Sequence, residues 1–223
     1  MRFLITAGGT REYIDPVRFI SNASSGKMGY ALARAALKAG HEVTLITAPT
    51  ALKPPAGAEV IRVENAAQMF AAVKEHFGRC DCLIMAAAVA DYTPAHPAKT
   101  KIKKNVGGRL GGASPTLHLD LKPTPDILKW AGRQGRVCCA HHKPKIVVGF
   151  ALEDRDLRAN AERKMRDKKL DMIIANTPGA IGADTSTLHI KTTKSDWVDI
   201  GNAQKAASAR CIIRMIEMHS VCR

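Results

Sequence analysis

A run of small hydroxyl residues joined to a glycine and a lysine is the first segment of this chain that could do chemistry. It reads Ser-Asn-Ala-Ser-Ser-Gly-Lys-Met-Gly over 21–29, at the start of a helix predicted over 25–39. The free backbone N–H groups and the dipole of a helix start attract anions, and Gly26 would let the backbone approach one. Ser24 or Ser25 as an ordinary helix cap explains the same residues, so the run alone favours an anion site only slightly.

Two groups of lysines could neutralise a polyphosphate. One is the run over 99–104, in which alternate lysines would share a face if the segment were extended. The other is Lys164 with Lys168, four residues apart and therefore on one face of a helix predicted over 158–169. Like charges at that spacing repel, and a bound anion would offset the cost. Solvated surface charge is, however, the commoner reason for such groups.

The end of a strand predicted over 82–87 offers a different kind of site. Small residues continue to Ala90 and leave room for a flat ring or a ribose at the carboxyl end of the strand. Asp91 follows and could bind a hydroxyl group or Mg²⁺. Capping of the next turn explains Asp91 equally well.

Three common sites are absent or weak. The G-x-G-x-x-G fingerprint of dinucleotide binding is missing, and Met28 follows Gly26-Lys27 where a P-loop needs Ser or Thr. The Cys-Cys-Ala-His-His segment over 138–142 places two cysteines side by side, a spacing that chelates a metal poorly. We interpret that segment as a loop.

The composition sets the class of protein. The chain has 223 residues, and the apolar fraction of 46% excludes a disordered or collagen-like chain. The formal net charge of +14 favours anionic partners. No apolar run is long enough to span a membrane, and the first residues are too short for a signal peptide. We therefore expect a cytoplasmic protein with no membrane partner.

Strands and helices alternate along the chain in the way that an α/β protein requires. The fold class is a Rossmann-like, doubly wound, mostly parallel sheet that ends in a hairpin and a helix opened by Asn202. We expect one domain over 1–223, with an excursion over 92–145 that closes over a site or makes a dimer contact. The predicted strands cover 2–7, 42–47, 60–63, 82–87, 146–152 and 172–175, with a hairpin over 188–200.

The segments above, taken together, resemble phosphopantothenate–cysteine ligase over nearly the whole chain. The resemblance is carried by Ile5–Glu12, Asp15–Arg18, Ser21-Asn22, Ser24–Gly29, Ala87–Tyr92, Lys101–Lys104, Pro125–Leu128, Val148–Ala151 and Ala175-Asn176. It implies a stand-alone ligase that joins 4′-phosphopantothenate to L-cysteine in coenzyme A biosynthesis, through an acyl-nucleotidylate and with release of pyrophosphate. It also implies Mg²⁺ held mainly by nucleotide phosphates, no flavin, a homodimer, and CTP in preference to ATP.

The resemblance also assigns roles to residues. Lys101 would act on the phosphates, and Asn22 would hold the acyl group while cysteine attacks it. The nucleotide would lie among Met85, Ala86, Ala87, Asp91, Lys101, Pro125, Asp126, Ile127, Leu128, Phe150, Lys164 and Lys168. The other substrate would lie among Arg18, Asn22, Ser25, Gly26, Lys27 and Asn176.

The sequence departs from the family at several points. Tyr13 replaces a common proline, and Gly182-Ala-Asp184-Thr-Ser186 replaces a Gly-x-Asp-x-Asn pattern. Residues 107–113 and 132–143 are expanded. Two alternative functions are an NAD(P)-dependent reductase, which the missing glycine fingerprint disfavours, and a nucleic-acid-binding module, which the net charge suggests but the scarcity of aromatic residues does not.

Overall fold

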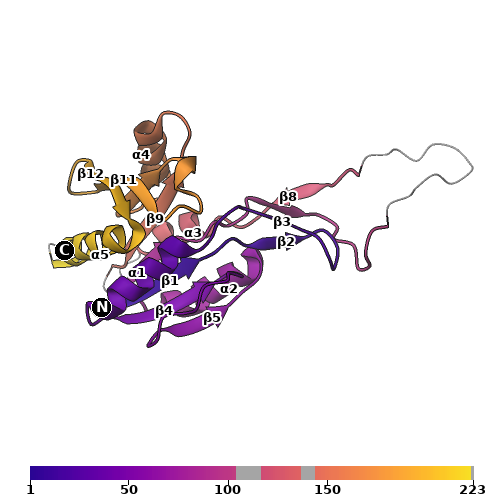
Figure 1. Ribbon diagram of the computed structural model, residues 1–223, viewed down its shortest axis with the longest axis horizontal. Coiled ribbons are helices and arrows are strands. Elements are labelled where there is room, and N and C mark those ends of the chain that lie inside the picture. The colour runs from indigo at the N-terminus through magenta and orange to yellow at the C-terminus, as the bar shows by residue number, and fades with distance from the viewer. Residues whose placement is uncertain (104–116, 137–143, 222–223) are drawn as a thin grey trace, which may run out of the picture.

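The computed structural model describes residues 1–103, 117–136 and 144–221, and its centre is one eight-stranded sheet (Figure 1). Six strands run parallel, and an antiparallel pair extends the sheet at one edge, which confirms the predicted fold class. The order is β12 (Val198–Gln204), β11 (Thr185–Thr192), β10 (Met172–Asn176), β9 (Ile146–Leu152), β6 (Cys82–Met85), β1 (Arg2–Ala7), β4 (Glu42–Thr47) and β5 (Glu59–Arg62).

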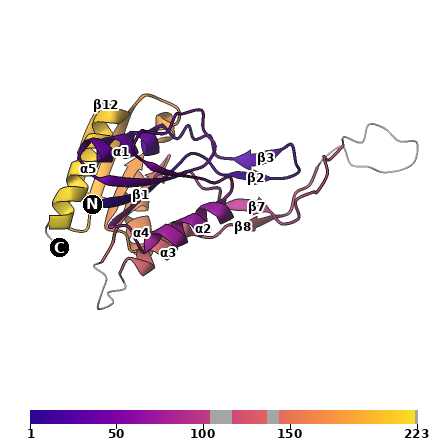
Figure 2. The same cartoon turned by 90° about the horizontal axis from the view of Figure 1, so that it is seen from below.

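Helices cover both faces of the sheet (Figures 1 and 2). One face carries α1 (Lys27–Lys38) and α5 (Lys205–Val221), which pack on each other over a core that includes Tyr30 and Ile212. The other face carries α2 (Ala66–Phe77), α3 (Ile127–Gln134) and α4 (Leu157–Asp167), over a core that includes Met69 and Ile173. The central strands are buried on both sides, as their continuous apolar sequences require.

The close approach of α1 to β1 depends on Gly29. A Cβ atom at this position would lie 2.6 Å from the Cβ of Ala7 and 2.9 Å from the carbonyl oxygen of Thr6. Only a glycine lets the helix backbone rest directly on the strand. This contact brings the first turn of α1 over the carboxyl end of β1.

An arm projects from the body of the molecule (Figures 1 and 2). We define it as residues 11–21, 92–103 and 117–123. It consists of two small antiparallel ribbons, β2 (Arg11–Tyr13) with β3 (Phe19–Ser21), and β7 (Tyr92–Pro94) with β8 (Leu121–Pro123).

Asp15 joins the parts of the arm. Its buried carboxylate accepts hydrogen bonds from the backbone N–H groups of Val17 and Arg18, at 2.8 Å each, and of Ile102, at 3.1 Å. Burial would raise the pKa of Asp15, but these hydrogen bonds and the charge of Arg18 outweigh it, so the pKa lies below its ordinary value. The guanidinium of Arg18 also donates to the carbonyl oxygen of Ile102, at 2.6 Å.

Several predicted boundaries were wrong at the helix ends. The cap of α1 is Gly26 in the left-handed region, with φ of 74°, rather than Ser24 or Ser25. Helix α4 ends at Asp167, so Lys168 follows the helix instead of lying inside it. Asn202 lies in β12, and the last helix begins at Lys205, because the edge hairpin continues further than its sequence pattern suggested.

The segment between β6 and β9 also differs from expectation. Strand β6 ends at Met85, and the lysines over 99–103 are not in a strand. Helix α3 belongs to the body, because Ile127, Leu128 and Ala131 are buried in the core, so the excursion is shorter than 92–145. The Cys-Cys-Ala-His-His segment lies outside the described residues. In the part of the chain that the structure does describe, no helix has the length and hydropathy to cross a bilayer.

Candidate functional site

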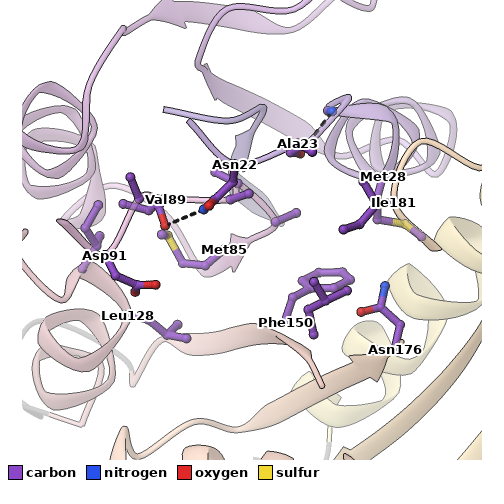
Figure 3. Close-up of a pocket in the computed structure, with 18 of the residues that line it drawn as sticks. Asn22, Ala23, Met28, Met85, Val89, Asp91, Leu128, Phe150, Asn176 and Ile181 are labelled. Atoms are coloured by element: carbon purple, nitrogen blue, oxygen red, sulfur yellow. Dashed lines mark hydrogen bonds between the residues drawn. The ribbon is translucent and has the colours of Figure 1, made fainter. Parts of the chain in front are cut away.

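A cavity of about 980 Å³ opens at the carboxyl ends of the parallel strands. It lies beside the neighbouring strands β1 and β6. After β1 the chain continues on one face of the sheet, and after β6 it continues on the other. Open α/β sheets bind ligands at such a point. Figure 3 shows Asp91 and Leu128 on one side of the space, Met28, Ile181 and Asn176 on the other, and Phe150 between them. The cavity is therefore lined by side chains from both halves of the sheet.

One wall of the cavity is the segment 86–90 after β6. Three of its peptide N–H groups are fixed by the neighbouring segments: that of Ala87 donates to Thr6 Oγ1 (3.1 Å), that of Ala88 to the carbonyl oxygen of Gly8 (2.9 Å), and that of Ala90 to Thr10 Oγ1 (2.9 Å). The Ala90 carbonyl oxygen accepts from Thr124 Oγ1 at 2.6 Å. Threonine hydroxyl groups and the carbonyl of Gly8 thus hold a wall made of small side chains and backbone.

Asn22 faces this wall from the segment that precedes α1 (Figure 3). Its Nδ2 donates to the carbonyl oxygen of Val89 at 3.1 Å, which holds the amide at the cavity. A carboxamide nitrogen carries two hydrogens, so the amide retains a second donor for a ligand. Ser25 and Gly26 follow Asn22 and also line the cavity, at the start of α1.

A first pair of lysines lies at the end of the cavity beside α3. The ammonium of Lys164 donates to the carbonyl oxygen of Phe150 at 2.8 Å, and that of Lys168 pairs with Asp126 at 2.8 Å. Burial, with the charge of Lys168 next in importance, lowers the pKa of Lys164. Burial would raise the pKa of Asp126, but the hydrogen bonds from Lys168 and from the backbone N–H of Lys129, together with the charges of both lysines, outweigh it and lower the pKa.

A second pair, Lys27 and Lys205, lies at the end of the cavity beside Ile181. Lys27 Nζ donates to the carbonyl oxygen of Gly182 (2.9 Å) and to Asp184 (2.7 Å), and Lys205 Nζ donates to the carbonyl oxygen of Ala180 (3.1 Å). The hydrogen bond from Lys27 lowers the pKa of Asp184. Burial first, and the charge of Lys27 second, lower the pKa of Lys205.

The structure brings nearly all of the predicted site residues to this cavity. Asn22, Ser25, Gly26, Lys27, Met85, Ala86, Ala87, Asp91, Pro125, Asp126, Ile127, Leu128, Phe150, Lys164, Lys168 and Asn176 line it. Arg18 and Lys101 are not among the lining residues: both belong to the arm, and both side chains are exposed. The roles of all these residues stay predictions.

Sequence reasoning missed Lys205 and the segment 180–182. Lys205 is a single lysine with no spacing that would mark it, and only the packing of α5 on α1 brings it to the cavity. The Gly-x-Asp pattern that begins at Gly182 was a weak indication that segment 180–182 lies at the site.

The described residues offer little to a metal ion beyond single carboxylates. Within the described ranges, no group of three His, Cys, Asp or Glu side chains is placed to hold one. Asp91 is exposed at the cavity and could contribute one oxygen ligand to Mg²⁺. Such a donor set fits an ion that arrives on nucleotide phosphates and keeps most of its other ligands.

Comparisons with known proteins find a matching family model, curated relatives and a solved structure. The family model for the DNA/pantothenate metabolism flavoprotein C-terminal domain matches residues 1–219. The coenzyme A biosynthesis bifunctional protein CoaBC of Bacillus subtilis (strain 168) is 45% identical over 192 residues, which cover 84% of this chain and 44% of that protein. The CoaBC protein of Borreliella burgdorferi is 36% identical over 218 residues, covering 96% of this chain and 52% of that protein.

A solved structure extends this similarity to the fold. The crystal structure of the C-terminal domain of CoaBC aligns with 100% of this chain and 96% of that domain, at a TM-score of 0.80 and 36% identity. This chain spans about half the length of the curated relatives that it matches.

Proposed function

Since this chain belongs to the family of the DNA/pantothenate metabolism flavoprotein C-terminal domain, we propose that it ligates 4′-phosphopantothenate to L-cysteine in coenzyme A biosynthesis. The observation that carries the proposal is one cavity with a pair of lysines at each end. A site of that shape and charge suits two phosphorylated substrates that must meet. CTP is the preferred nucleotide in the proposal, and ATP is the alternative.

In the first step, a carboxylate oxygen of phosphopantothenate attacks the α-phosphorus of CTP, and pyrophosphate leaves with the electrons of the broken P–O bond. The product is an acyl-cytidylate. Both reactants are anions, so the lysines lower the repulsion between them and stabilise the charge that develops on pyrophosphate. Mg²⁺ on the phosphates would supply further charge neutralisation, and Asp91 could hold it with one carboxylate oxygen.

In the second step, the amino nitrogen of cysteine attacks the acyl carbon, the amine loses a proton, and CMP leaves. The free N–H of the Asn22 amide would donate to the acyl oxygen, where negative charge develops during this attack. Neither step moves electrons between redox states, so the reaction needs no flavin.

Lys101 lies on the arm and does not line the cavity of its own chain. Its proposed role at the phosphates therefore needs a second chain. Exposed apolar side chains gather on the same arm, including Val17 (57% exposed), Tyr92 (55%) and Leu121 (45%). A second copy of the chain would cover these side chains. We therefore include a homodimer in which the arm of one chain brings Lys101 and Arg18 to the cavity of the other.

The test is a measurement of pyrophosphate release from the purified protein with phosphopantothenate, cysteine, Mg²⁺ and either CTP or ATP. We expect steady release with CTP, and a single stoichiometric burst when cysteine is omitted, because the acyl-cytidylate then accumulates. Chelation of Mg²⁺ should abolish both signals. Absence of pyrophosphate with both nucleotides would contradict the proposed ligase.

A further inference from the structure

Two helices of the body begin with a lysine at the same end of the cavity. Lys27 is the first residue of α1, Lys205 is the first residue of α5, and neither helix has an acidic residue in its first turn. The start of a helix carries a partial positive charge, so a cation there is unfavourable. The lysines also repel each other, since the charge of Lys27 lowers the pKa of Lys205. Helix stability therefore does not account for either residue.

The oxygen atoms that now bind these lysines all belong to one short segment, 180–184, which we call the strap. It supplies the carbonyl oxygens of Ala180 and Gly182 and the carboxylate of Asp184. The side chain of Asp184 is 86% exposed, so water reaches this carboxylate beside its ion pair with Lys27. The strap thus presents three acceptor oxygens to two ammonium groups inside a cavity that is open to a ligand.

We propose that Lys205 and Lys27 form a phosphate-binding subsite, and that the oxygens of a bound phosphate replace those of the strap. A phosphate group offers several acceptor oxygens around one centre, which two mobile point charges can share without a fixed geometry. The subsite accepts the phosphate of either proposed substrate, the nucleotide or phosphopantothenate. The identity of its ligand rests on the proposed function, but its affinity for phosphate does not.

The test measures equilibrium binding by the full chain, by calorimetry, of inorganic tripolyphosphate, CTP and 4′-phosphopantothenate separately. Lys205→Gln should weaken tripolyphosphate and at least one of the two substrates about tenfold or more, because a charge-assisted hydrogen bond is lost. The substrate that weakens is the one whose phosphate occupies the subsite. Lys205→Arg keeps the charge and should bind within about threefold of the wild type.

The matched control is Lys38→Gln, which removes the same charge at the far end of α1, about 16 Å away along the helix, where the lysine is exposed. This control should bind all three ligands like the wild type. Unchanged binding by Lys205→Gln, or an equal loss in Lys205→Gln and Lys205→Arg, would overturn the subsite.

Asp184→Asn tests whether phosphate oxygens replace the oxygen atoms of the strap at the two lysines. Loss of its carboxylate removes a competing anion from Lys27, so tripolyphosphate should bind severalfold more tightly. Unchanged or weaker binding in this exposed-site variant would overturn the replacement. None of these measurements requires turnover, so a protein that binds phosphate at Lys205 but releases no pyrophosphate would refute only the ligase.

Discussion

Lys164 keeps its ammonium group partly out of water, beside the like charge of Lys168 and bonded to the carbonyl oxygen of Phe150. The lowered pKa means that the folded protein disfavours the charged form of this residue. A position that costs stability and faces a cavity is typical of a ligand-binding residue.

Lys164→Met should therefore separate stability from binding. We expect the melting temperature to stay level or rise, because a buried charge is replaced by an apolar side chain of similar length. CTP affinity should fall about tenfold or more, because a cation at the phosphates is lost. Calorimetry and a thermal melt on the same sample measure both, and a marked fall in melting temperature would contradict this reading of Lys164.

Lys101 and Asn22 should affect different steps of the proposed reaction. Lys101→Gln should abolish pyrophosphate release. Asn22→Asp should slow formation of the cysteine adduct more than formation of the acyl-cytidylate, because it places a negative charge beside the acyl oxygen. Single-turnover reactions with labelled CTP follow the two steps separately, with Lys38→Gln as the control. Equal losses in both steps for both variants would refute the assigned roles.

Helix α1 can hold its first turn at the cavity only while it rests on β1 at Gly29. Gly29→Ala should lower the free energy of unfolding by about 1–3 kcal/mol, because the new methyl group meets Ala7 and the backbone of Thr6. Gly78→Ala is the matched control: Gly78 follows α2 with helical backbone angles, and nothing lies near its Cβ position. We expect that control to be neutral or slightly stabilising in urea unfolding. Equal effects of the two substitutions would show that the close approach does not matter.

The elements differ in how far the sequence predicted them. The parallel strands were predictable because each is a short apolar run between turn residues, as in Arg2–Ala7 and Ile146–Leu152. The ribbon of β2 and β3 was missed, since each strand has three residues, which is too short to show a period in the sequence. The start of α5 was misplaced because Asn202 reads as a helix cap while the exposed edge strand β12 is still continuing.

The candidate site was predictable only in part for the same kind of reason. Lys164 with Lys168 and the run before α1 are local patterns, and local patterns can be read from a single sequence. Lys27 and Lys205 come from opposite ends of the chain and lie close together only in the folded protein. Their proximity depends on the packing of two helices on one face of the sheet, which no local pattern encodes.

The whole molecule has a body that holds the cavity and an arm that reaches away from it (Figure 1). If two chains pair through their arms, Val17→Ser combined with Leu121→Ser should convert a dimer to a monomer in sedimentation velocity experiments. These side chains are exposed in a single chain, so the monomer should remain folded. A wild-type protein that sediments as a monomer would contradict the proposed dimer.

Mixing two impaired variants, assayed at CTP too dilute for Lys164→Met to bind it well, tests whether the arm acts on the other chain. Lys101→Gln and Lys164→Met, mixed and allowed to exchange, should recover about a quarter of the wild-type activity, because half of the dimers are mixed and each contains one intact site. A lysine acting within its own chain would leave both sites of the mixed dimer defective. No recovery would therefore place Lys101 in its own cavity.

The wall over 86–90 limits how this protein can change its choice of ligand. A ligand against that wall meets peptide groups fixed by Thr6, Thr10 and Thr124, and side chains that are only alanine and valine. Substitution of those side chains alters the shape of the wall but leaves its pattern of donors and acceptors in place. Point mutations can therefore narrow or widen the space, whereas a new hydrogen-bonding preference would require the chain itself to shift. Ligand preference at such a wall should change slowly during evolution, even where the surrounding sequence changes freely.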